Sequence, residues 1–276
     1  MERISSRQNA IVKRFRDVAR GDQPHLMLLD GEHLLREAIA SGIQISTAAF
    51  ADGADVHELM RGMQQKGAEV ITVTGQVLAA ISPVREPSGV VAIASRPRTS
   101  LNDVLAAPAP TKPEPGVGSA IRQPLVVMLS DVQDPGNMGA VIRAAEGCSA
   151  TGVICSEATA DPFGWKALRG AMGSTFRLPV VAKQPLDTAI ANARASGLRV
   201  FATIARGGTP LPDCNLRTPS AVLFGSEGRG LAENLIAAAD ERLTIPMQRP
   251  VESLNVAVAA ALVVYEAARQ RRAPHR

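Results

Sequence analysis

The sequence predicts an α/β protein of two domains, the second of them built on a mainly parallel sheet with helices on both faces. The chain has 276 residues, which is long for one domain and sufficient for two apolar cores. Strand and helix patterns alternate in its second half, as is typical of parallel sheets. Between Pro97 and Pro124 six prolines fall within 28 residues, which indicates a linker. We therefore expect domains over residues 1–96 and 125–276, joined by a linker over 97–124.

Apolar periodicity in the first 96 residues predicts a small α/β domain. The expected helices cover residues 9–20, 32–41 and 56–66. The expected strands cover residues 26–30, 45–51, 70–73 and 90–94. The proline-rich linker that follows can hold this domain as a semi-rigid tether, or it can be a spacer without function.

The second domain repeats the alternation of strand and helix. The expected strands cover residues 125–129, 152–155, 198–203, 221–224 and 243–245. The expected helices cover residues 138–148, 185–196, 231–238 and 254–271. In sheets of this kind ligands bind beyond the carboxyl ends of the strands. Three polar segments follow such ends, so we expect a site there.

Composition excludes several classes of protein. Apolar residues make up 46% of the chain and charged residues 20%, as in soluble globular proteins. The longest nearly uninterrupted apolar stretch, residues 256–265, is far below the roughly 20 residues of a membrane span, and the N-terminus lacks the apolar core of a secretory signal. Three cysteines without close pairing, Cys148, Cys155 and Cys214, indicate neither disulfides nor a zinc site. We expect a cytoplasmic protein with no membrane partner and no metal.

The basic residues gather at the two ends of the chain. The net charge is +4, but residues 1–20 carry six Arg or Lys against two acids, and residues 269–276 carry four Arg and no acid. Such segments suit phosphate contacts with nucleic acid; solvated terminal charge that aids solubility is the alternative. Aromatic residues are scarce at 3%, which argues against base stacking as the main device for binding RNA.

The first polar segment is the loop from Ser130 to Asn137. It is too polar and too rich in turn residues to continue the strand before it. Asn137 is expected to cap the helix that carries Arg143, six residues onward. An ordinary N-cap with a surface arginine is one interpretation. The other is a binding site, because small residues beside Asn137 let a substrate backbone approach closely.

The second and third polar segments follow later strands. Residues 225–230, Gly-Ser-Glu-Gly-Arg-Gly, match neither the dinucleotide-binding nor the P-loop pattern. Their backbone amides can hold a ligand, or the glycines can simply form a tight turn. Ile245-Pro-Met247 ends the last strand, and Glu252-Ser-Leu-Asn255 opens the final helix. Ser253 and Asn255 are both suitable helix caps, which is the structural alternative to a role in the site.

Together these segments resemble the three signature motifs of the SpoU family of RNA ribose methyltransferases, within the SPOUT superfamily. The matching segments are Asp134–Arg143, Phe224–Gly230, and Ile245–Met247 with Glu252–Asn255. Residues 4–13 and 29–38 are similar to the N-terminal substrate-binding domain often joined to these enzymes, which has a ribosomal-protein-like fold. The resemblance implies a C-terminal trefoil knot and transfer of a methyl group from S-adenosylmethionine to a ribose 2′-hydroxyl, without a metal.

The same resemblance implies roles for individual residues. The implied catalytic residues are Asn137, Arg143, Glu227, Ser253 and Asn255. The implied cofactor-binding residues are Phe224, Gly225, Glu227, Gly228, Gly230, Ile245, Met247, Ser253 and Leu254. The expected RNA-binding residues, on terminal charge and family pattern together, are Arg7, Lys13, Arg14, Arg143 and Arg169. Glu227 can anchor its loop, orient Arg143 or counter the sulfonium charge, and the sequence does not rank these roles.

The expected partner is structured RNA, with ribosomal RNA favoured over tRNA, and not DNA, because the 2′-hydroxyl distinguishes the two. A guanidinium almost never releases its proton, so Arg143 is assigned to binding phosphate and polarising the hydroxyl rather than to acting as a base. Alternatives are a tRNA ribose methyltransferase, a methyltransferase acting on a base, and a catalytically silent RNA-binding or ribosome-assembly protein. The helix over residues 254–271 is apolar on nearly every face, which indicates a homodimer interface or a central core helix.

Overall fold

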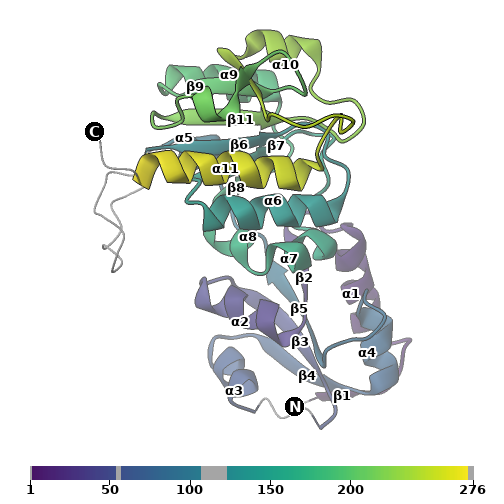
Figure 1. Cartoon of the computed structure of the whole chain (residues 1–276). Coiled ribbons are helices and arrows are strands. Elements are labelled where there is room, and N and C mark those ends of the chain that lie inside the picture. Colours follow the sequence, from purple (N-terminus) through teal and green to yellow (C-terminus); the bar gives the residue numbers. More distant parts are fainter. Residues whose placement is uncertain (1, 54–56, 107–122, 273–276) are drawn as a thin grey trace. The chain divides into compact units, whose positions relative to one another are not determined.

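The computed structural model describes residues 2–53, 57–106 and 123–272 and divides them between two compact units (Figure 1). The N-terminal unit consists of Met1–Arg98 and Phe163–Phe176, and the C-terminal unit of Thr99–Pro162 and Arg177–Arg276. The first boundary lies close to residue 96, where we expected the first domain to end. The return of the chain at Phe163–Phe176 was not expected. Most of the expected linker, residues 107–122, lies outside the described residues.

The N-terminal unit contains a five-stranded sheet in the order β1-β4-β3-β5-β2. Strands β1, β4 and β3 pair in parallel, whereas β5 pairs antiparallel with both β3 and β2. The strands are β1 (Glu2–Ile4), β2 (Leu26–Asp30), β3 (Ile45–Ala51), β4 (Glu69–Val73) and β5 (Val90–Ser95). The carboxyl ends of β1 to β4 therefore meet at one edge of this sheet.

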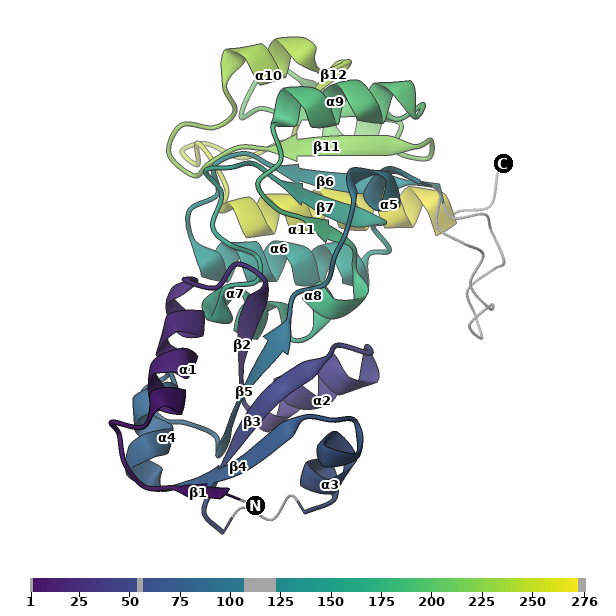
Figure 2. The ribbon, with the colours of Figure 1, turned by 180° about the vertical axis from the view of Figure 1, so that it is seen from behind.

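Helices cover both faces of the N-terminal sheet, with α1 and α4 on one face and α2 and α3 on the other (Figures 1 and 2). These helices are α1 (Ala10–Arg20), α2 (Glu32–Ala40), α3 (His57–Gln65) and α4 (Gly75–Ile81). Asn9 is the N-cap of α1, and its side chain accepts a hydrogen bond from the Ile11 amide. Gly21, in the left-handed conformation, is the C-cap. Its buried face, centred on Phe15, joins the core between α1, α4 and the sheet.

The C-terminal unit is built on a seven-stranded sheet in which every pairing is parallel. The strand order is β10-β12-β9-β11-β6-β7-β8. The strands are β6 (Leu125–Leu129), β7 (Gly152–Cys155), β8 (Val180–Val181), β9 (Arg199–Thr203), β10 (Thr209–Pro210), β11 (Ser220–Phe224) and β12 (Glu241–Thr244). All residues of β6 and β11 are buried, as expected for central strands covered on both faces.

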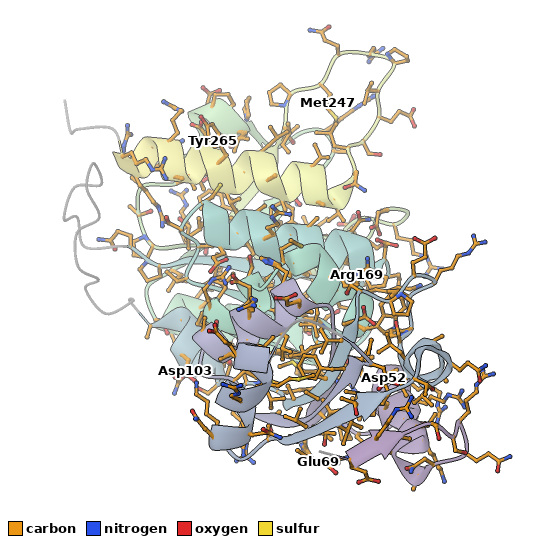
Figure 3. The ribbon with its side chains drawn as sticks, turned by 90° about the horizontal axis from the view of Figure 1, so that it is seen from below. Asp52, Glu69, Asp103, Arg169, Met247 and Tyr265 are labelled. Carbon is orange, nitrogen blue, oxygen red and sulfur yellow. The ribbon has the colours of Figure 1, made fainter. Side chains whose placement is uncertain are left out.

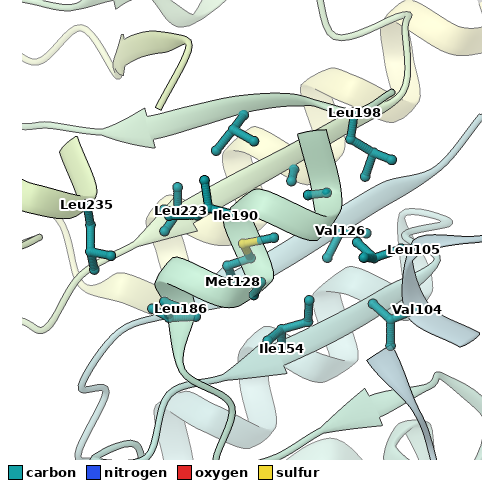
Figure 4. Close-up of a cluster of buried hydrophobic side chains, with 14 of the residues drawn as sticks. Val104, Leu105, Val126, Met128, Ile154, Leu186, Ile190, Leu198, Leu223 and Leu235 are labelled. Carbon is teal, nitrogen blue, oxygen red and sulfur yellow. The ribbon is translucent and has the colours of Figure 1, made fainter. Parts of the chain in front are cut away.

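Helices α9 and α10 lie on one face of this sheet, and α6 and α11 pack together on the other (Figures 1 and 2). The helices are α5 (Leu101–Leu105), α6 (Pro135–Gly147), α9 (Leu186–Ala195), α10 (Glu233–Ala238) and α11 (Val256–Arg272), with a 3₁₀ turn η1 at Leu211–Asp213. The core beneath α9 joins side chains from the sheet to Leu186 and Ile190 (Figure 4). Val104 and Leu105 of α5 complete it.

The α/β class and the parallel sheet are therefore confirmed, whereas the trefoil knot stays a prediction. Helix α5 lies inside the segment expected to be linker. It forms because Ser100 and Asp103 make a capping box and because Val104 is fully buried. Helices α7 (Trp165–Ala171) and α8 (Ser174–Arg177) were also not expected. No helix in the described part of the chain is long and apolar enough to cross a membrane.

Candidate active site

Three loops meet at the carboxyl edge of the C-terminal sheet. The loops follow β6, β11 and β12, and the order β12-β9-β11-β6 places these strands within four neighbouring positions. All these strands run in parallel, so their carboxyl ends face the same way. Each loop carries one of the three polar segments that the sequence indicated. The fold therefore brings together segments about a hundred residues apart.

A chain of side-chain hydrogen bonds joins the three loops. The Nδ2 of Asn255 donates to Oδ1 of Asn137 at 3.0 Å, and Nδ2 of Asn137 donates to Oε1 of Glu227 at 2.6 Å. Asn137 lies on α6, Glu227 follows β11, and Asn255 precedes α11. Because Asn137 uses its acceptor toward one neighbour and a donor toward the other, its amide orientation is fixed by both. These three residues form the centre of the candidate site.

We expected Asn137 to cap α6, but another residue does so. The helix begins at Pro135, and its N-cap is Asp134, whose Oδ1 accepts from the Asn137 backbone amide at 2.7 Å. Proline at the first helical position fits this start, because its missing N–H would have no helical partner. The cap therefore comes from a neighbouring carboxylate. The Asn137 side chain is left to make the contacts with Glu227 and Asn255.

Asn255 has two roles at the start of α11. Its Oδ1 accepts from the amides of Ala257 at 2.9 Å and Val258 at 3.3 Å, which satisfies free donors at the helix N-terminus. Its Nδ2 donates to Asn137. The capping interpretation of Asn255 is therefore confirmed, and its role in the site stays a prediction. Capping fixes the side chain that reaches α6.

The loop after β11 turns back sharply on itself. An isolated bridge pairs Ser226 with Gly230, and the Gly230 amide donates to the Ser226 carbonyl at 3.0 Å. A Cβ at Gly225 would lie 2.1 Å from the backbone of Gly230. This distance is too short for any residue other than glycine. Gly230 also has a φ of +67°, which favours glycine. A Cβ at Gly228, in contrast, would meet no atom within 4 Å. Two of the three glycines are thus required by the shape of the loop.

Arg143 and Ser253 are not part of the hydrogen-bonded chain that joins the three loops. Both side chains are exposed, and neither makes a hydrogen bond or ion pair with any other residue that the structure describes. Arg143 lies six residues after Asn137 on α6, about one and two-thirds turns of helix, so the two residues point in different directions. The Arg143 guanidinium is therefore open to a ligand or to another chain.

The other residues expected to bind a cofactor lie around the same three loops. Phe224 is buried at the end of β11, so only its backbone faces the loop. Ile245, Met247 and Leu254 are half-buried in the segment between β12 and α11; Met247 is labelled in Figure 3. Across the described residues, no group of three or more His, Cys, Asp or Glu side chains could hold a metal ion.

The residues expected to bind RNA differ in how available they are. Arg7 and Lys13 are exposed. Arg14 is already engaged, because its guanidinium donates to Thr47 Oγ1 at 3.2 Å and to Ser46 Oγ at 3.5 Å. Arg169 is exposed on α7 (Figure 3). These four residues belong to the N-terminal unit.

Arg169 also has an electrostatic role inside the N-terminal unit. Asp30, at the end of β2, is 7% exposed. Burial raises the pKa of the Asp30 carboxyl, while a hydrogen bond from Ser82 and the positive charge of Arg169 lower it in part. Helix α7 packs on β2, which accounts for this pairing. Arg169 thus stabilises a buried carboxylate, whatever else it binds.

One segment at the candidate site was missed from the sequence. Strand β9 lies between β11 and β12, so the loop over residues 204–208 lies between two of the loops described above. The Ile204 amide donates to the Leu243 carbonyl at 2.9 Å, and the Gly208 amide donates to Thr244 Oγ1 at 2.9 Å. No motif distinguishes this loop. Only the strand order, which the sequence does not state, places it at the site.

The sequence profile of the SpoU rRNA methylase family matches residues 124–265, and that of the thiostrepton-resistance methylase N terminus matches residues 1–107. The chain therefore belongs to the SpoU rRNA methylase family. An uncharacterized tRNA/rRNA methyltransferase of Synechocystis sp. is 31% identical over 97% of this chain and 94% of its own length. The 23S rRNA (guanosine(2553)-2′-O)-methyltransferase RlmP of Bacillus subtilis is 28% identical over 96% of this chain and 98% of its own.

Solved structures agree with this assignment. An S-adenosylmethionine-bound rRNA methyltransferase from Sinorhizobium meliloti superposes with a TM-score of 0.83 at 29% identity and covers 97% of both chains. The SpoU methyltransferase AviRb from Streptomyces viridochromogenes, in complex with the same cofactor, gives a TM-score of 0.81 at 25% identity over 96% of this chain and 98% of its own. The similarity extends over both units of the fold.

Proposed function

We propose that this chain transfers a methyl group from S-adenosylmethionine to a ribose 2′-hydroxyl in ribosomal RNA. The observation that carries the proposal is the hydrogen-bonded chain from Asn255 through Asn137 to Glu227. It joins one polar residue from each of the three motifs that resemble those of ribose methyltransferases. A full-length relative, RlmP, is named for 2′-O-methylation of 23S rRNA, which supports this substrate class.

The loop after β11 fits the proposed cofactor. Gly225 has no room for a side chain. Gly228 and Gly230 are exposed, and because they have no side chains the loop backbone is accessible there. Backbone amides and carbonyls are thus available to bind the adenosine and amino-acid groups. Half-buried Met247 and Leu254 supply apolar surface from the neighbouring segment. When bound, S-adenosylmethionine supplies an electrophilic methyl group on a sulfonium.

The reaction needs the attacking oxygen, the methyl carbon and the sulfur nearly in line, so most of the catalysis comes from positioning. Asn137, held from both sides by Glu227 and Asn255, is suited to orient the ribose. Arg143 keeps its proton and presents a planar charged fork suited to a phosphate beside that ribose. It lowers the cost of proton loss from the 2′-hydroxyl by stabilising negative charge. The proton passes to phosphate or water.

A homodimer accounts for the exposed face that α6 and α11 share. On α11, Val258, Leu262 and Tyr265 are 49%, 42% and 62% exposed and follow one face of the helix. On α6, the exposed residues Gly136, Ala140, Arg143 and Gly147 recur at helical spacing. Small residues allow close approach of a second helix. A second copy of this chain would cover the apolar side chains, and Arg143 would then lie at the boundary between subunits.

The proposal is tested by offering labelled S-adenosylmethionine and purified fractions of ribosomal RNA and tRNA to the protein. We expect label in ribosomal RNA and little in tRNA. Label in tRNA alone would replace the proposed substrate with the tRNA alternative. Cofactor binding without transfer to either fraction would favour the catalytically silent alternative and overturn the proposal.

A further inference from the structure

We propose that Arg206, Arg229 and Arg249 form an arginine rim that binds backbone phosphates of RNA beside the methylation site. The inference rests on the proposed function, because it takes RNA as the substrate. It assigns a binding role to three residues that lie outside the catalytic set. Arg229 lies within the second motif, at residues 225–230, but the sequence indicated a role for none of the three.

The three arginines lie in the segments that follow three neighbouring strands. Arg206 lies in the loop after β9, Arg229 in the loop after β11, and Arg249 in the segment after β12. The strands are adjacent in the order β12-β9-β11 and run in parallel. Neighbouring strands lie about 4.8 Å apart, so the three loops leave the sheet within about 10 Å of one another.

The guanidinium groups of the rim have N–H donors that bond to no other described residue. All three residues are exposed, and within the described parts of the chain none of their side chains makes a hydrogen bond or ion pair. Each guanidinium presents five N–H donors in a fixed fork that matches the oxygens of a phosphate. The rim is therefore available to an external anion.

Arginines at the opposite edge of the same sheet are used differently. Arg194 pairs with Asp240, and Arg199 pairs with Glu241 at 2.8 Å. Arg217 donates from Nε to the Gln270 carbonyl at 3.3 Å. Arg271 donates to four backbone carbonyls, those of Gln123, Pro124, Leu216 and Thr218. These four arginines at the amino edge hold the fold together, whereas the three arginines of the rim have no side-chain partner among the described residues.

Acidic residues at the carboxyl edge are mostly bonded within the fold. Asp134 caps α6, Asp131 accepts from Ser156 Oγ at 3.0 Å, and Glu227 accepts from Asn137. Glu252 is exposed and makes no hydrogen bond with the residues described. Asp131, Asp134 and Glu227 thus have positions set by neighbouring donors, and none of these four carboxylates pairs with the arginine rim.

The cofactor does not account for the rim. Its sulfonium carries a positive charge, which three nearby cations would repel rather than attract. Its single carboxylate can occupy one arginine fork at most. The ligand that suits several unpaired forks in a row is a chain of phosphates.

The test compares the full-length protein with Arg206→Gln, Arg229→Gln and Arg249→Gln, singly and together. The probe is a fluorescein-labelled oligouridylate, and its affinity is measured over a range of salt concentrations. Each lost phosphate contact on single-stranded RNA lowers the slope of log affinity against log salt by about 0.7, so the triple variant should lose about 2. We expect the KM of the triple variant for ribosomal RNA to rise by about tenfold or more. The dissociation constant of S-adenosylmethionine should not change.

Arg194→Gln is the control for charge, because it removes one exposed positive charge at the amino edge, away from the rim; its folding is checked, since the pair with Asp240 is lost. Its salt slope and KM should equal those of the unsubstituted protein. An unchanged salt slope in the triple variant would overturn the rim, as would a loss of cofactor affinity with RNA binding intact. Failure of the proposed function would instead show in the unsubstituted protein, as absence of methyl transfer.

Discussion

Asn137 is the residue on which the candidate site depends. It accepts a hydrogen bond from Asn255 and donates one to Glu227, so one amide connects two loops to α6. The sequence indicated all three residues through their resemblance to family motifs. It could not indicate that they touch, because the contacts join positions 90 and 118 residues apart. The expectation that Asn137 caps its helix was wrong, because Asp134 is better placed to do so.

Replacing Arg143 tests the division of labour within the site. Arg143 is exposed and lies outside the hydrogen-bonded chain, so Arg143→Ala should leave the fold intact. We expect the affinity for S-adenosylmethionine to stay within a few-fold, and turnover to fall by about a hundredfold or more, as for other groups that stabilise transition-state charge. Calorimetric titration of the cofactor and a methyl-transfer assay measure the two effects. Loss of cofactor binding in a folded variant would contradict this assignment.

Asp30 gives a prediction about stability and pH. Its raised pKa means that above the ordinary value of 3.8 the folded chain holds protons that the unfolded chain has lost. The stability contributed by Asp30 is therefore greatest at low pH and decreases as pH rises through the folded-state pKa. Asp30→Asn keeps an acceptor for Ser82 and removes the charge.

We expect Asp30→Asn to be more stable than the unsubstituted protein at neutral pH, with the difference shrinking as the pH approaches the ordinary carboxyl value. Denaturant midpoints measured across this pH range give the comparison. A variant that is less stable at neutral pH would show that the attraction to Arg169 outweighs the cost of burial.

At the scale of elements, the strands and long helices followed from alternation and periodicity. The five strands expected in the second domain are all present, with ends shifted by a few residues. Strands β8 and β10 were missed because two residues carry no periodic pattern. Helix α5 was missed because it lies in proline-rich sequence, and what stabilises it is the burial of Val104 and Leu105 in the core of the C-terminal unit.

The loop after β11 gives a prediction with an internal control. A methyl group at Gly225 would collide with the backbone of Gly230, whereas one at Gly228 would meet open space. We expect Gly225→Ala to weaken S-adenosylmethionine binding by at least about tenfold, because the loop must open to admit the side chain. Gly228→Ala should change binding by less than about twofold. Equal effects of the two substitutions would show that the closed loop is not the cofactor site.

At the scale of the whole molecule, the exposed face of α6 and α11 is the surface that we propose to form the dimer interface. The sequence indicated that the final helix needs cover on nearly every side, either in a core or in a dimer. The structure packs α11 against α6 and leaves Val258, Leu262 and Tyr265 exposed; Tyr265 is labelled in Figure 3. Because exposed apolar side chains that lie together are typical of interaction surfaces, we expect this face to be covered by a second copy of the chain.

Charged substitutions on this face should give a monomer. Leu262→Glu and Tyr265→Glu place carboxylates at positions that are exposed in the single chain, so folding should be preserved. In a dimer the same carboxylates would be buried without a partner, which destabilises the interface. Sedimentation equilibrium should show a dimer for the unsubstituted protein and a monomer for both variants. Met172→Glu, at another exposed apolar position, should leave the dimer intact. A monomeric unsubstituted protein would contradict the proposed assembly.

We propose that Asn137, Glu227 and Asn255 form a site that directs methyl transfer to a sugar oxygen. The most direct measurement is to methylate ribosomal RNA with this protein and then hydrolyse the product with alkali. A 2′-O-methyl group removes the hydroxyl that attacks the neighbouring phosphate, so we predict that the label is recovered in an alkali-resistant dinucleotide. Recovery of the label in mononucleotides, with the methyl group on a base, would contradict the account.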